Sequence, residues 1–271
     1  MKMFESIKDQ IGNVKKIVFV TGAGISQESG IPTFRGKDGL WRNHDAMKLA
    51  TIDAFYDDPK LVWEWYVERR TNIFSASPNA GHIAIAQLEK YCDVVILTQN
   101  IDGLHQRAGS NHVLELHGSI VKIKCTVCDF NDEIMTDFSE NPPLCKCGNI
   151  LRPDVVWFGE SLPQDVWQKA IIHANQCDLM IIVGTSLVVS PANTLPIYAK
   201  QNNAMLIEIN PEKMLNPAME LKHETLAEFI KAYLDEADSF ARTKTGALKQ
   251  IASVELSEKN IYSLTRQDFS D

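Results

Sequence analysis

Five short, mostly apolar segments, rich in β-branched residues, are distributed along the chain. They are Ile17–Val20, Val94–Leu97, Val113–Leu116, Met180–Val183 and Met205–Ile209. Runs of this length are shorter than most helices and are typical of strands buried within a sheet. The pattern therefore predicts five buried β-strands.

Four segments between these strands have apolar positions three and four residues apart, the period of an amphipathic helix. Each opens with a proline, which suits a first helical turn because that turn needs no N–H at its start. The segments are Pro59–Phe74, Pro78–Tyr91, Pro163–Asn175 and Pro191–Asn202. Strands that alternate with helices predict an α/β fold with a parallel, doubly wound sheet.

Two segments interrupt this alternation. Gly36–Ser77 has a helical pattern, and Lys122–Leu151 is loop-like and contains cysteines. We interpret them as one small inserted module. Further along, a helix is expected from Glu224 to about Ala237, and the polar, weakly periodic segment Ser239–Asp271 indicates a mobile tail.

Polar residues follow the predicted strands at their carboxyl ends, the edge at which an open parallel sheet binds ligands. After the first strand, Gly22 and Gly24 would let the backbone approach a pyrophosphate at a helix N-terminus. The full GxGxxG fingerprint is incomplete, because Gln27 occupies its third position and no acidic residue is placed to hold a ribose. This argues against an ordinary dehydrogenase, and a glycine-rich turn without a ligand remains an alternative.

Asn100, Asp102 and His117 follow the second and third predicted strands, which are neighbours. Together they supply an amide, a carboxylate and an imidazole, the groups needed to orient a carboxamide and a ribose and to remove a hydroxyl proton near neutral pH. A solitary histidine is more often a structural hydrogen-bonding residue, but its position at a strand end favours catalysis.

Four cysteines are grouped as Cys125-x-x-Cys128 and Cys145-x-Cys147, with sixteen residues between the pairs. This spacing matches a four-thiolate zinc site. Four protein thiolates complete the coordination of zinc and leave no position for an activated water, so the metal would be structural. A redox pair or free thiols are the alternative.

Composition narrows the class of partner. The 271 residues are 45% hydrophobic, enough for a sizeable core, and the net charge is −8. That charge argues against binding to nucleic acid, which requires clustered positive charge. The first sixteen residues lack the apolar stretch of a signal peptide, and no run approaches the roughly 18 apolar residues of a membrane span. We therefore expect a cytoplasmic protein with no membrane partner.

Taken together, the motifs resemble the sirtuin family over roughly Lys16–Glu212. The segments that carry the resemblance are GAGISQESGIPTFRG (Gly22–Gly36), TQNIDGLHQRAG (Thr98–Gly109), LELHGS (Leu114–Ser119), the four cysteines, PDVVWFGE (Pro153–Glu160), GTSLVVSPA (Gly184–Ala192) and INP (Ile209–Pro211). The resemblance implies an NAD-dependent protein lysine deacylase that also holds one structural zinc ion.

Site residues follow from the resemblance position by position. His117 would be the general base, with Asn100 and Asp102 beside it in the catalytic group. The implied NAD-binding residues are Gly22, Ala23, Gly24, Ser26, Phe34, Arg35, Gln99, Asn100, Asp102, Gly184, Thr185, Ser186, Asn210 and Pro211. The substrate peptide would pair as an added strand with Val156, Trp157, Phe158 and Gly159.

The resemblance also implies the reaction. The acyl-lysine amide oxygen attacks the anomeric carbon of the nicotinamide ribose and expels nicotinamide, and His117 then helps a ribose hydroxyl attack the resulting imidate. Water completes the reaction, which yields free lysine and an O-acyl-ADP-ribose. An aromatic cap such as Phe34 would exclude water from the oxocarbenium-like centre.

Tyr66 and Arg69 suggest which acyl group is removed. Three residues apart on a helix, they share a face, so the phenol and the guanidinium can grip a carboxylate together. The pair resembles that of class III sirtuins, which remove succinyl, malonyl or glutaryl groups. The alternative is an amphipathic helix whose aromatic residues pack inward while Arg69 and Arg70 are solvated.

The chain is expected to divide into two units and a tail. Residues 1–35, 78–121 and 152–238 would form a Rossmann-like NAD-binding domain, residues 36–77 and 122–151 the helical and zinc-ribbon module, and residues 239–271 the tail. After Asn210 the chain departs from the family pattern, because Pro211–Phe229 lacks the glycine-containing turn that closes over adenine. A weaker adenine pocket would raise the Michaelis constant for NAD.

Other functions fit some of these features. The same dinucleotide site could transfer ADP-ribose to a protein, the enzyme could be a plain deacetylase without a preference for acidic acyl groups, or a zinc-ribbon module could bind NAD without catalysis.

Overall fold

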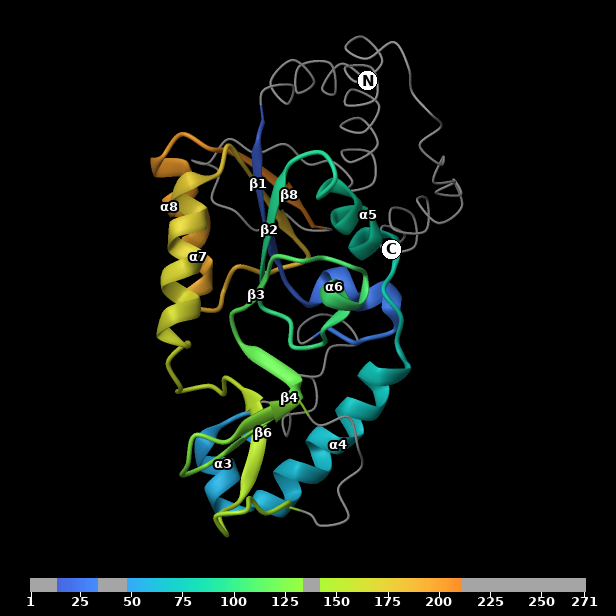
Figure 1. The fold of residues 1–271 in the computed structure, drawn as a ribbon, viewed down its shortest axis with the longest axis vertical. Helices are drawn as coiled ribbons and strands as arrows, with labels where there is room; N and C mark the ends of the chain where they lie inside the picture. Colours follow the sequence, from blue (N-terminus) through green and yellow to red (C-terminus); the bar gives the residue numbers. More distant parts are fainter. Residues whose placement is uncertain (1–13, 34–47, 134–141, 211–271) are drawn as a thin grey trace.

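A computed structural model describes residues 14–33, 48–133 and 142–210 of the chain (Figure 1). Within these residues, five parallel strands form the main sheet in the order β3-β2-β1-β7-β8. The strands are β1 (Lys16–Thr21), β2 (Asp93–Thr98), β3 (Val113–Glu115), β7 (Leu179–Val183) and β8 (Met205–Ile209). All five predicted strands and the parallel, doubly wound α/β class are thus confirmed.

The order of the strands reverses at β1, which lies at the centre of the sheet. The chain passes from β1 outward to β2 and β3 on one side, and to β7 and β8 on the other. The loops that follow β1 and β7 therefore meet at the carboxyl edge of the sheet, where Gly22 N donates to Val183 O (3.0 Å) and Gly24 N to Gly184 O (2.8 Å). Such a switch point is where open α/β sheets bind ligands.

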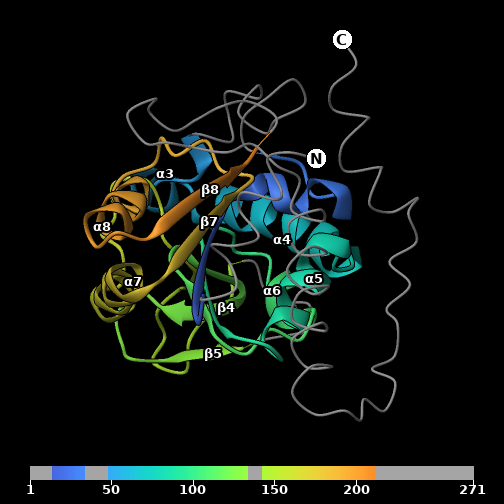
Figure 2. The same cartoon turned by 90° about the horizontal axis from the view of Figure 1, so that it is seen from above.

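Helices cover both faces of this sheet (Figure 2). They include α5 (Ala80–Leu88), α6 (Leu104–Arg107), α7 (Gln164–Gln176) and α8 (Leu195–Gln201), with the 3-10 helices η1 (Ala23–Ser29) and η3 (Ala192–Thr194). Ile85 and Leu88 of α5 pack with Phe19 on one face, whereas Ala170 of α7 and Ala199 of α8 pack with Val18 on the other. Two apolar layers therefore hold the sheet between its helices.

The expectation that each predicted helix opens with a proline is confirmed only for α4 (Pro59–Ser75), whose first residue is Pro59. In α5 the Asn79 side chain accepts hydrogen bonds from Gly81 N and His82 N, so this cap sets the start and Pro78 lies before it. Pro163 is the N-cap of α7, and the segment predicted from Pro191 is divided between η3 and α8.

The second unit is an antiparallel sheet that packs against two helices, at the lower end of Figure 1. Its described strands, in the order β5-β4-β6, are β4 (Gly118–Cys125), β5 (Asn131–Glu133) and β6 (Leu151–Val155), and its helices are α3 (Ile52–Asp57) and α4. Trp63 and Tyr66 of α4 pack with Ile123 and Leu151 of the sheet. The two segments that we assigned to one module therefore share a core.

The expected loop character of residues 122–151 is wrong at both ends of that segment, because β4 extends through Cys125 and β6 begins at Leu151. The sequence does contain the signal, since buried Ile123 alternates with the half-buried Lys122 and Lys124.

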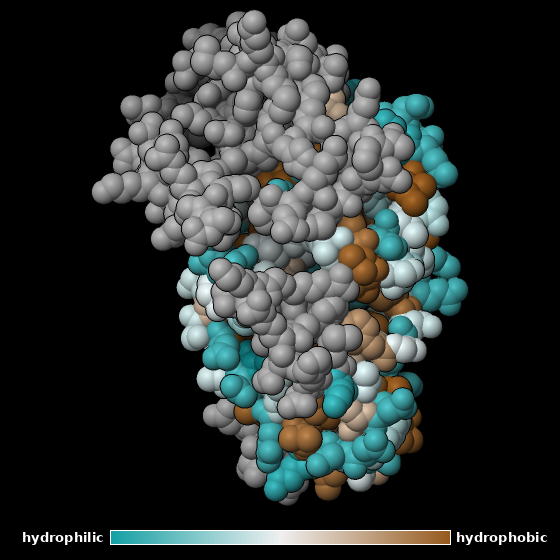
Figure 3. Space-filling view, turned by 180° about the vertical axis from the view of Figure 1, so that it is seen from behind, coloured by the Kyte–Doolittle hydropathy of each residue, from teal (hydrophilic) through white to brown (hydrophobic). Residues whose placement is uncertain are grey.

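Hydrophobic and hydrophilic residues are interspersed on the described surface seen in Figure 3. Among the residues described, no helix has the length and apolar character needed to cross a membrane. The helix expected after Glu224 and the tail over residues 239–271 lie outside the described part of the chain.

Candidate active site

His117 lies between β3 and β4, beside the carboxyl end of β2. Its Nδ1 donates a hydrogen bond to the backbone carbonyl of Gln99 (2.9 Å), because a carbonyl oxygen can only accept. Burial lowers the pKa of His117 below its usual value, and the bond to Gln99 opposes that shift. The neutral ring therefore carries its lone pair on Nε2, which is the state required of a general base.

Asn100, Asp102 and Ser26 form one buried hydrogen-bonded group. Ser26 Oγ donates to Asp102 Oδ2 (2.7 Å), and Asn100 Nδ2 donates to Ser26 Oγ (3.2 Å) and to the carbonyl of Gly22 (3.0 Å). Asp102 Oδ1 accepts from Leu104 N (2.9 Å). Burial raises the pKa of Asp102, and the bonds from Leu104 and Ser26 oppose that rise. The group fixes both side chains at the end of β2, next to η1.

Two buried histidines that sequence reasoning missed extend this group. His82 Nε2 lies 3.5 Å from Ser26 Oγ, and His105 Nε2 lies 3.0 Å from Thr21 Oγ1, with the two rings 4.8 Å apart at their centroids. Burial lowers the pKa of His82 to about 4 and that of His105 to about 3. Both rings are therefore neutral at physiological pH. The available signal was a histidine within the apolar face of each short helix.

Gly22 and Gly24 are required by contact between two loops. A Cβ on Gly22 would lie 2.6 Å from Thr185 Cβ, and a Cβ on Gly24 would lie 2.7 Å from Gly184 Cα. Real side chains do not tolerate such distances. The loop after β1 can therefore sit against the loop after β7 only with glycine at these positions, whatever ligand approaches them.

Hydrogen bonds link Thr185 and Asn210, two of the expected NAD-binding residues, to Gln99 beside His117. Gln99 Nε2 donates to Thr185 Oγ1 (2.8 Å), and Asn210 Nδ2 donates to Thr185 O (3.1 Å) and to Glu208 Oε1 (2.8 Å). Ala23 and Ser186 are half-buried in the same two loops. The switch point thus presents amides, hydroxyls and a carboxylate together, a set that fits a dinucleotide. Phe34, Arg35 and Pro211 lie outside the described residues.

The four predicted metal ligands converge. The sulfurs of Cys125, Cys128, Cys145 and Cys147 all lie within 4.8 Å of one another, with Cys125 and Cys147 3.5 Å apart and Cys128 and Cys145 3.6 Å apart. Tetrahedral coordination at the usual zinc–sulfur distance of about 2.3 Å separates sulfurs by about 3.8 Å, so the cluster fits zinc. A hydrogen bond from Asn149 lowers the pKa of Cys147 to about 6, which favours the thiolate.

Residues 156–160 continue from β6 towards the base. Val156 N donates to the carbonyl of His117 (2.9 Å), and Phe158 N donates to the carbonyl of Ala50 (2.9 Å). Trp157 is buried, Phe158 is 41% exposed, and Gly159 has a positive φ of 90°. Several of the backbone donors expected for strand pairing therefore bind within the protein, and pairing with a peptide would depend more on the carbonyl groups.

Tyr66 and Arg69 lie side by side on α4. The Arg69 guanidinium is 5.5 Å from the centre of the Tyr66 ring and 4.6 Å from that of Trp65. Burial raises the pKa of Tyr66, and burial lowers that of Arg69, against the influence of Tyr66. The alternative reading of this helix is confirmed for the aromatic residues Trp63 and Tyr66, which pack inward and are buried. It is wrong for Arg70, which is not solvated but buried, and which donates to the carbonyl of Ile120 (2.8 Å).

Tyr66 is also connected to the base region. Its Oη accepts a hydrogen bond of 2.8 Å from Trp157 Nε1. Trp157 thus joins Tyr66, a candidate for binding the acyl group, to the segment whose Val156 binds the His117 carbonyl.

Comparisons with known proteins agree with this geometry. Residues 22–191 match the model of the Sir2 family. An NAD-dependent protein deacylase of Aquifex aeolicus is 48% identical over 85% of this chain and 97% of its own length. The crystal structure of a Sir2 homologue bound to NAD (42% identity, TM-score 0.80) covers 87% of this chain and 94% of its own. A Sir2 structure with a p53 peptide and NAD+ (36% identity, TM-score 0.76) covers 88% and 100%.

Proposed function

The chain belongs to the Sir2 family and is an NAD-dependent protein-lysine deacylase, and we propose that His117 is its general base and that it prefers acyl groups ending in a carboxylate. The observation that carries the first part is the bond from His117 Nδ1 to the Gln99 carbonyl. It assigns the ring hydrogen to Nδ1 and leaves Nε2 to accept a proton.

NAD, when bound, supplies a nicotinamide–ribose bond whose cleavage drives removal of the acyl group. The protein's part is to orient the bound substrates and to accept and hold protons. His117 Nε2 accepts the proton of a ribose hydroxyl. The Ser26–Asp102–Asn100 group fixes one side of the pocket, and its internal hydrogen bonds mean that little reorganisation is needed on binding.

Zinc has a separate part in this proposal. The four cysteines would hold it near the end of β4 away from His117, and four thiolates would complete its coordination. The metal would therefore stabilise the small unit, and the reaction would take place at the switch point.

Acylated proteins are the substrates that we propose, since a similar Sir2 structure contains a p53 peptide. Residues 156–159 support this role because they join the His117 segment on one side and the α4 residues on the other. A peptide held along this segment by its backbone would be recognised with little demand on its sequence.

Preference for an acidic acyl group is supported by Tyr66 and Arg69. Both side chains belong to α4, the guanidinium lies against the phenol ring, and Tyr66 is linked through Trp157 to the segment beside His117. A phenol and a guanidinium together can bind a carboxylate through charge-assisted hydrogen bonds. An acetyl group offers no such partner.

A peptide panel tests this function. Acetyl-, malonyl- and succinyl-lysine peptides of one sequence are incubated with NAD, and the masses of the products are measured. We expect loss of the acyl mass with release of nicotinamide, faster for malonyl and succinyl than for acetyl. A gain of ADP-ribose on protein, without loss of acyl mass, would instead indicate mono-ADP-ribosyl transfer.

Arg69→Met tests the acyl preference. It should weaken succinyl-lysine cleavage by about 2–5 kcal/mol, the usual cost of removing one partner from a desolvated charge pair, with a much smaller effect on acetyl-lysine. Equal losses on the two peptides would exclude the gripping role.

A further inference from the structure

Tyr66 Oη has one hydrogen to donate and two lone pairs to accept with. Trp157 Nε1 occupies one lone pair, at 2.8 Å. An indole N–H can only donate, so the direction of this bond is fixed. The phenol hydrogen of Tyr66 must therefore be directed to an acceptor other than Trp157.

Arg69 also lies beside Tyr66, with its guanidinium 5.5 Å from the centre of the Tyr66 ring. A guanidinium also has only donors. Neither neighbour can therefore accept the phenol hydrogen, which is left to donate to a ligand that approaches Oη. A carboxylate, which only accepts, is the matching ligand.

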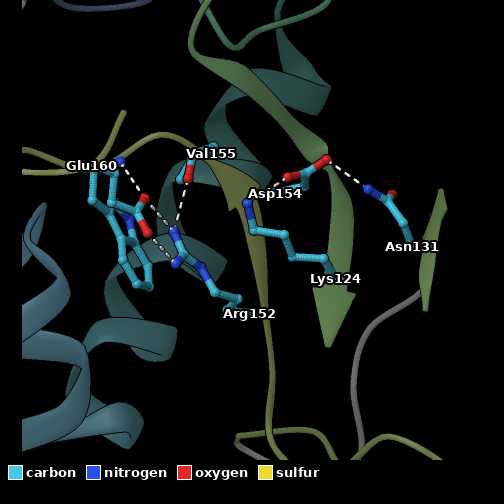
Figure 4. Close-up of polar contacts among 7 residues, drawn as sticks. Lys124, Asn131, Arg152, Asp154, Val155 and Glu160 are labelled. Atoms are coloured by element: carbon cyan, nitrogen blue, oxygen red, sulfur yellow. Dashed lines mark hydrogen bonds and ion pairs between the residues drawn. The ribbon is translucent and has the colours of Figure 1, made fainter. Parts of the chain in front are cut away.

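Trp157 is held in place by an ion pair that the proposed chemistry does not use. The Arg152 guanidinium lies 3.4 Å from the centre of the Trp157 ring, and its Nη1 and Nη2 bind the two carboxylate oxygens of Glu160 at 2.6 and 2.8 Å. Glu160 Oε2 also accepts from Trp157 N (2.8 Å), and Arg152 Nη2 donates to the carbonyl of Val155 (2.9 Å). Figure 4 shows Arg152 facing both Glu160 and Val155.

The arrangement fixes the indole on two sides. Glu160 binds the backbone of Trp157 and, at the same time, the cation stacked on its ring. The Arg152 side chain is only 7% exposed and that of Glu160 19%, so water competes weakly with these bonds. A buried, bidentate arginine–carboxylate pair of this kind sets geometry more than it adds stability.

We propose that Trp157 is a specificity-determining positioning residue: its indole N–H, held in place by the Arg152–Glu160 pair, directs the Tyr66 hydroxyl to donate to the carboxylate of an acidic acyl group. This inference rests on the proposed acyl preference and deepens it. Tyr66 contacts the acyl group, and Trp157 acts through Tyr66.

The test measures the ratio of kcat/KM for succinyl-lysine to that for acetyl-lysine in the full-length, zinc-loaded protein. Trp157→Phe removes the indole N–H and retains an aromatic ring for Arg152 to stack on. We expect the ratio to fall about tenfold, the usual effect of losing one hydrogen bond that orders a recognition group. Because it is a ratio, a general loss of activity does not change it.

A double-mutant comparison separates positioning from packing. Tyr66→Phe removes the hydroxyl. The double variant Tyr66→Phe/Trp157→Phe should therefore have the same ratio as Tyr66→Phe alone. A packing effect would persist in the double variant. Lys124→Met is the matched control, because it breaks the 2.9 Å ion pair with Asp154 on the same antiparallel sheet, also drawn in Figure 4, and has no bond to Trp157.

The outcomes are distinct. In one outcome, Arg69→Met strongly lowers the ratio while Trp157→Phe leaves it at the wild-type value. The inference about Trp157 is then wrong and the acyl preference stands. If the wild-type protein does not favour succinyl-lysine and Arg69→Met changes nothing, the acyl preference itself is wrong. A loss in Lys124→Met equal to that in Trp157→Phe also overturns the inference.

Arg152→Lys serves if Trp157→Phe does not fold. Lysine keeps the charge beside Glu160 but loses the planar, bidentate contact and the stacking on the indole. The ratio should fall in this variant as well. An unchanged ratio in the folded protein would contradict the role of the Arg152–Glu160 pair.

Discussion

The imidazole of His117 donates its Nδ1 hydrogen to the backbone carbonyl of Gln99 across 2.9 Å. This bond joins the loop after β3 to the end of β2 and fixes the tautomer of the ring. Since a backbone carbonyl cannot be removed by substitution, the tautomer depends on the register of two neighbouring strands. The basic nitrogen is therefore determined by the fold of the sheet.

His117→Ala should abolish turnover and leave NAD binding measurable. General base catalysis is worth about 10²–10⁴ in rate, so nicotinamide release on an acyl-lysine peptide should fall by at least about 100-fold. Titration calorimetry with NAD reports binding. His112→Ala, at an exposed histidine nearby, is the matched control and should be as active as wild type. Turnover that survives in His117→Ala would place the base elsewhere.

The pH dependence of kcat/KM should show the lowered pKa of His117. Burial disfavours the charged ring, so its pKa lies below the ordinary value of about 6.5. The neutral, active form therefore persists to lower pH than for a free imidazole. We expect the acidic limb of the profile, measured with saturating NAD, to have its midpoint below about 6.5. A midpoint well above that value contradicts the assignment.

Removing zinc should unfold the small unit, because structural zinc contributes folding free energy directly. Cys145→Ser, or a chelator on the wild-type protein, should abolish hydrogen-exchange protection in β4 and β6 before it is lost in β1 and β2. Cys92→Ser is the control, since Cys92 lies outside the cluster of four. Equal loss of protection in both sheets would show that the units unfold together.

The buried pair His82 and His105 should make stability depend on pH below neutrality. Their pKa values are lowered from 6.5 to about 4 and about 3, so the unfolded chain binds protons that the folded chain excludes. Their contribution is complete above about pH 6.5 and is lost as the pH falls towards the folded values. Each ring should remove about 1 kcal/mol from the free energy of unfolding between about pH 6.5 and 5.5.

Urea unfolding at several pH values measures this effect. His105→Gln should flatten the dependence on pH relative to wild type, while His112→Gln, at the exposed histidine, should follow it. Parallel curves for wild type and His105→Gln would show that other groups govern the acid sensitivity.

Several elements could be predicted because their signals are local. The apolar runs identified all five strands of the main sheet, since a buried strand needs apolar residues at successive positions. The start of α5 could not be taken from Pro78, because the hydrogen bonds of the Asn79 cap decided it. In β4 the alternation is short and overlaps the cysteines, so the sequence pattern indicates a loop there.

The candidate site divides in the same way. Asn100, Asp102 and His117 were predicted together because parallel strands present their carboxyl ends at one edge. For Gly22 and Gly24 the structure adds a second requirement to the predicted approach of a pyrophosphate, because the loop after β7 leaves no room for a Cβ at either position. The His82–His105 pair could not be predicted, because its two helices are brought together only by packing.

The sequence by itself determined the five strands of the main sheet, the cysteine spacing and the polar strand ends, because each depends on residues close together in the chain. The tertiary structure decided which nitrogen of His117 is basic and which way the Tyr66 hydroxyl can donate. The Trp157–Tyr66 bond joins residues 91 positions apart across 2.8 Å, and its direction is fixed because an indole N–H can only donate. No local pattern specifies such a distance, because it results from two sheets and the helices packed against them.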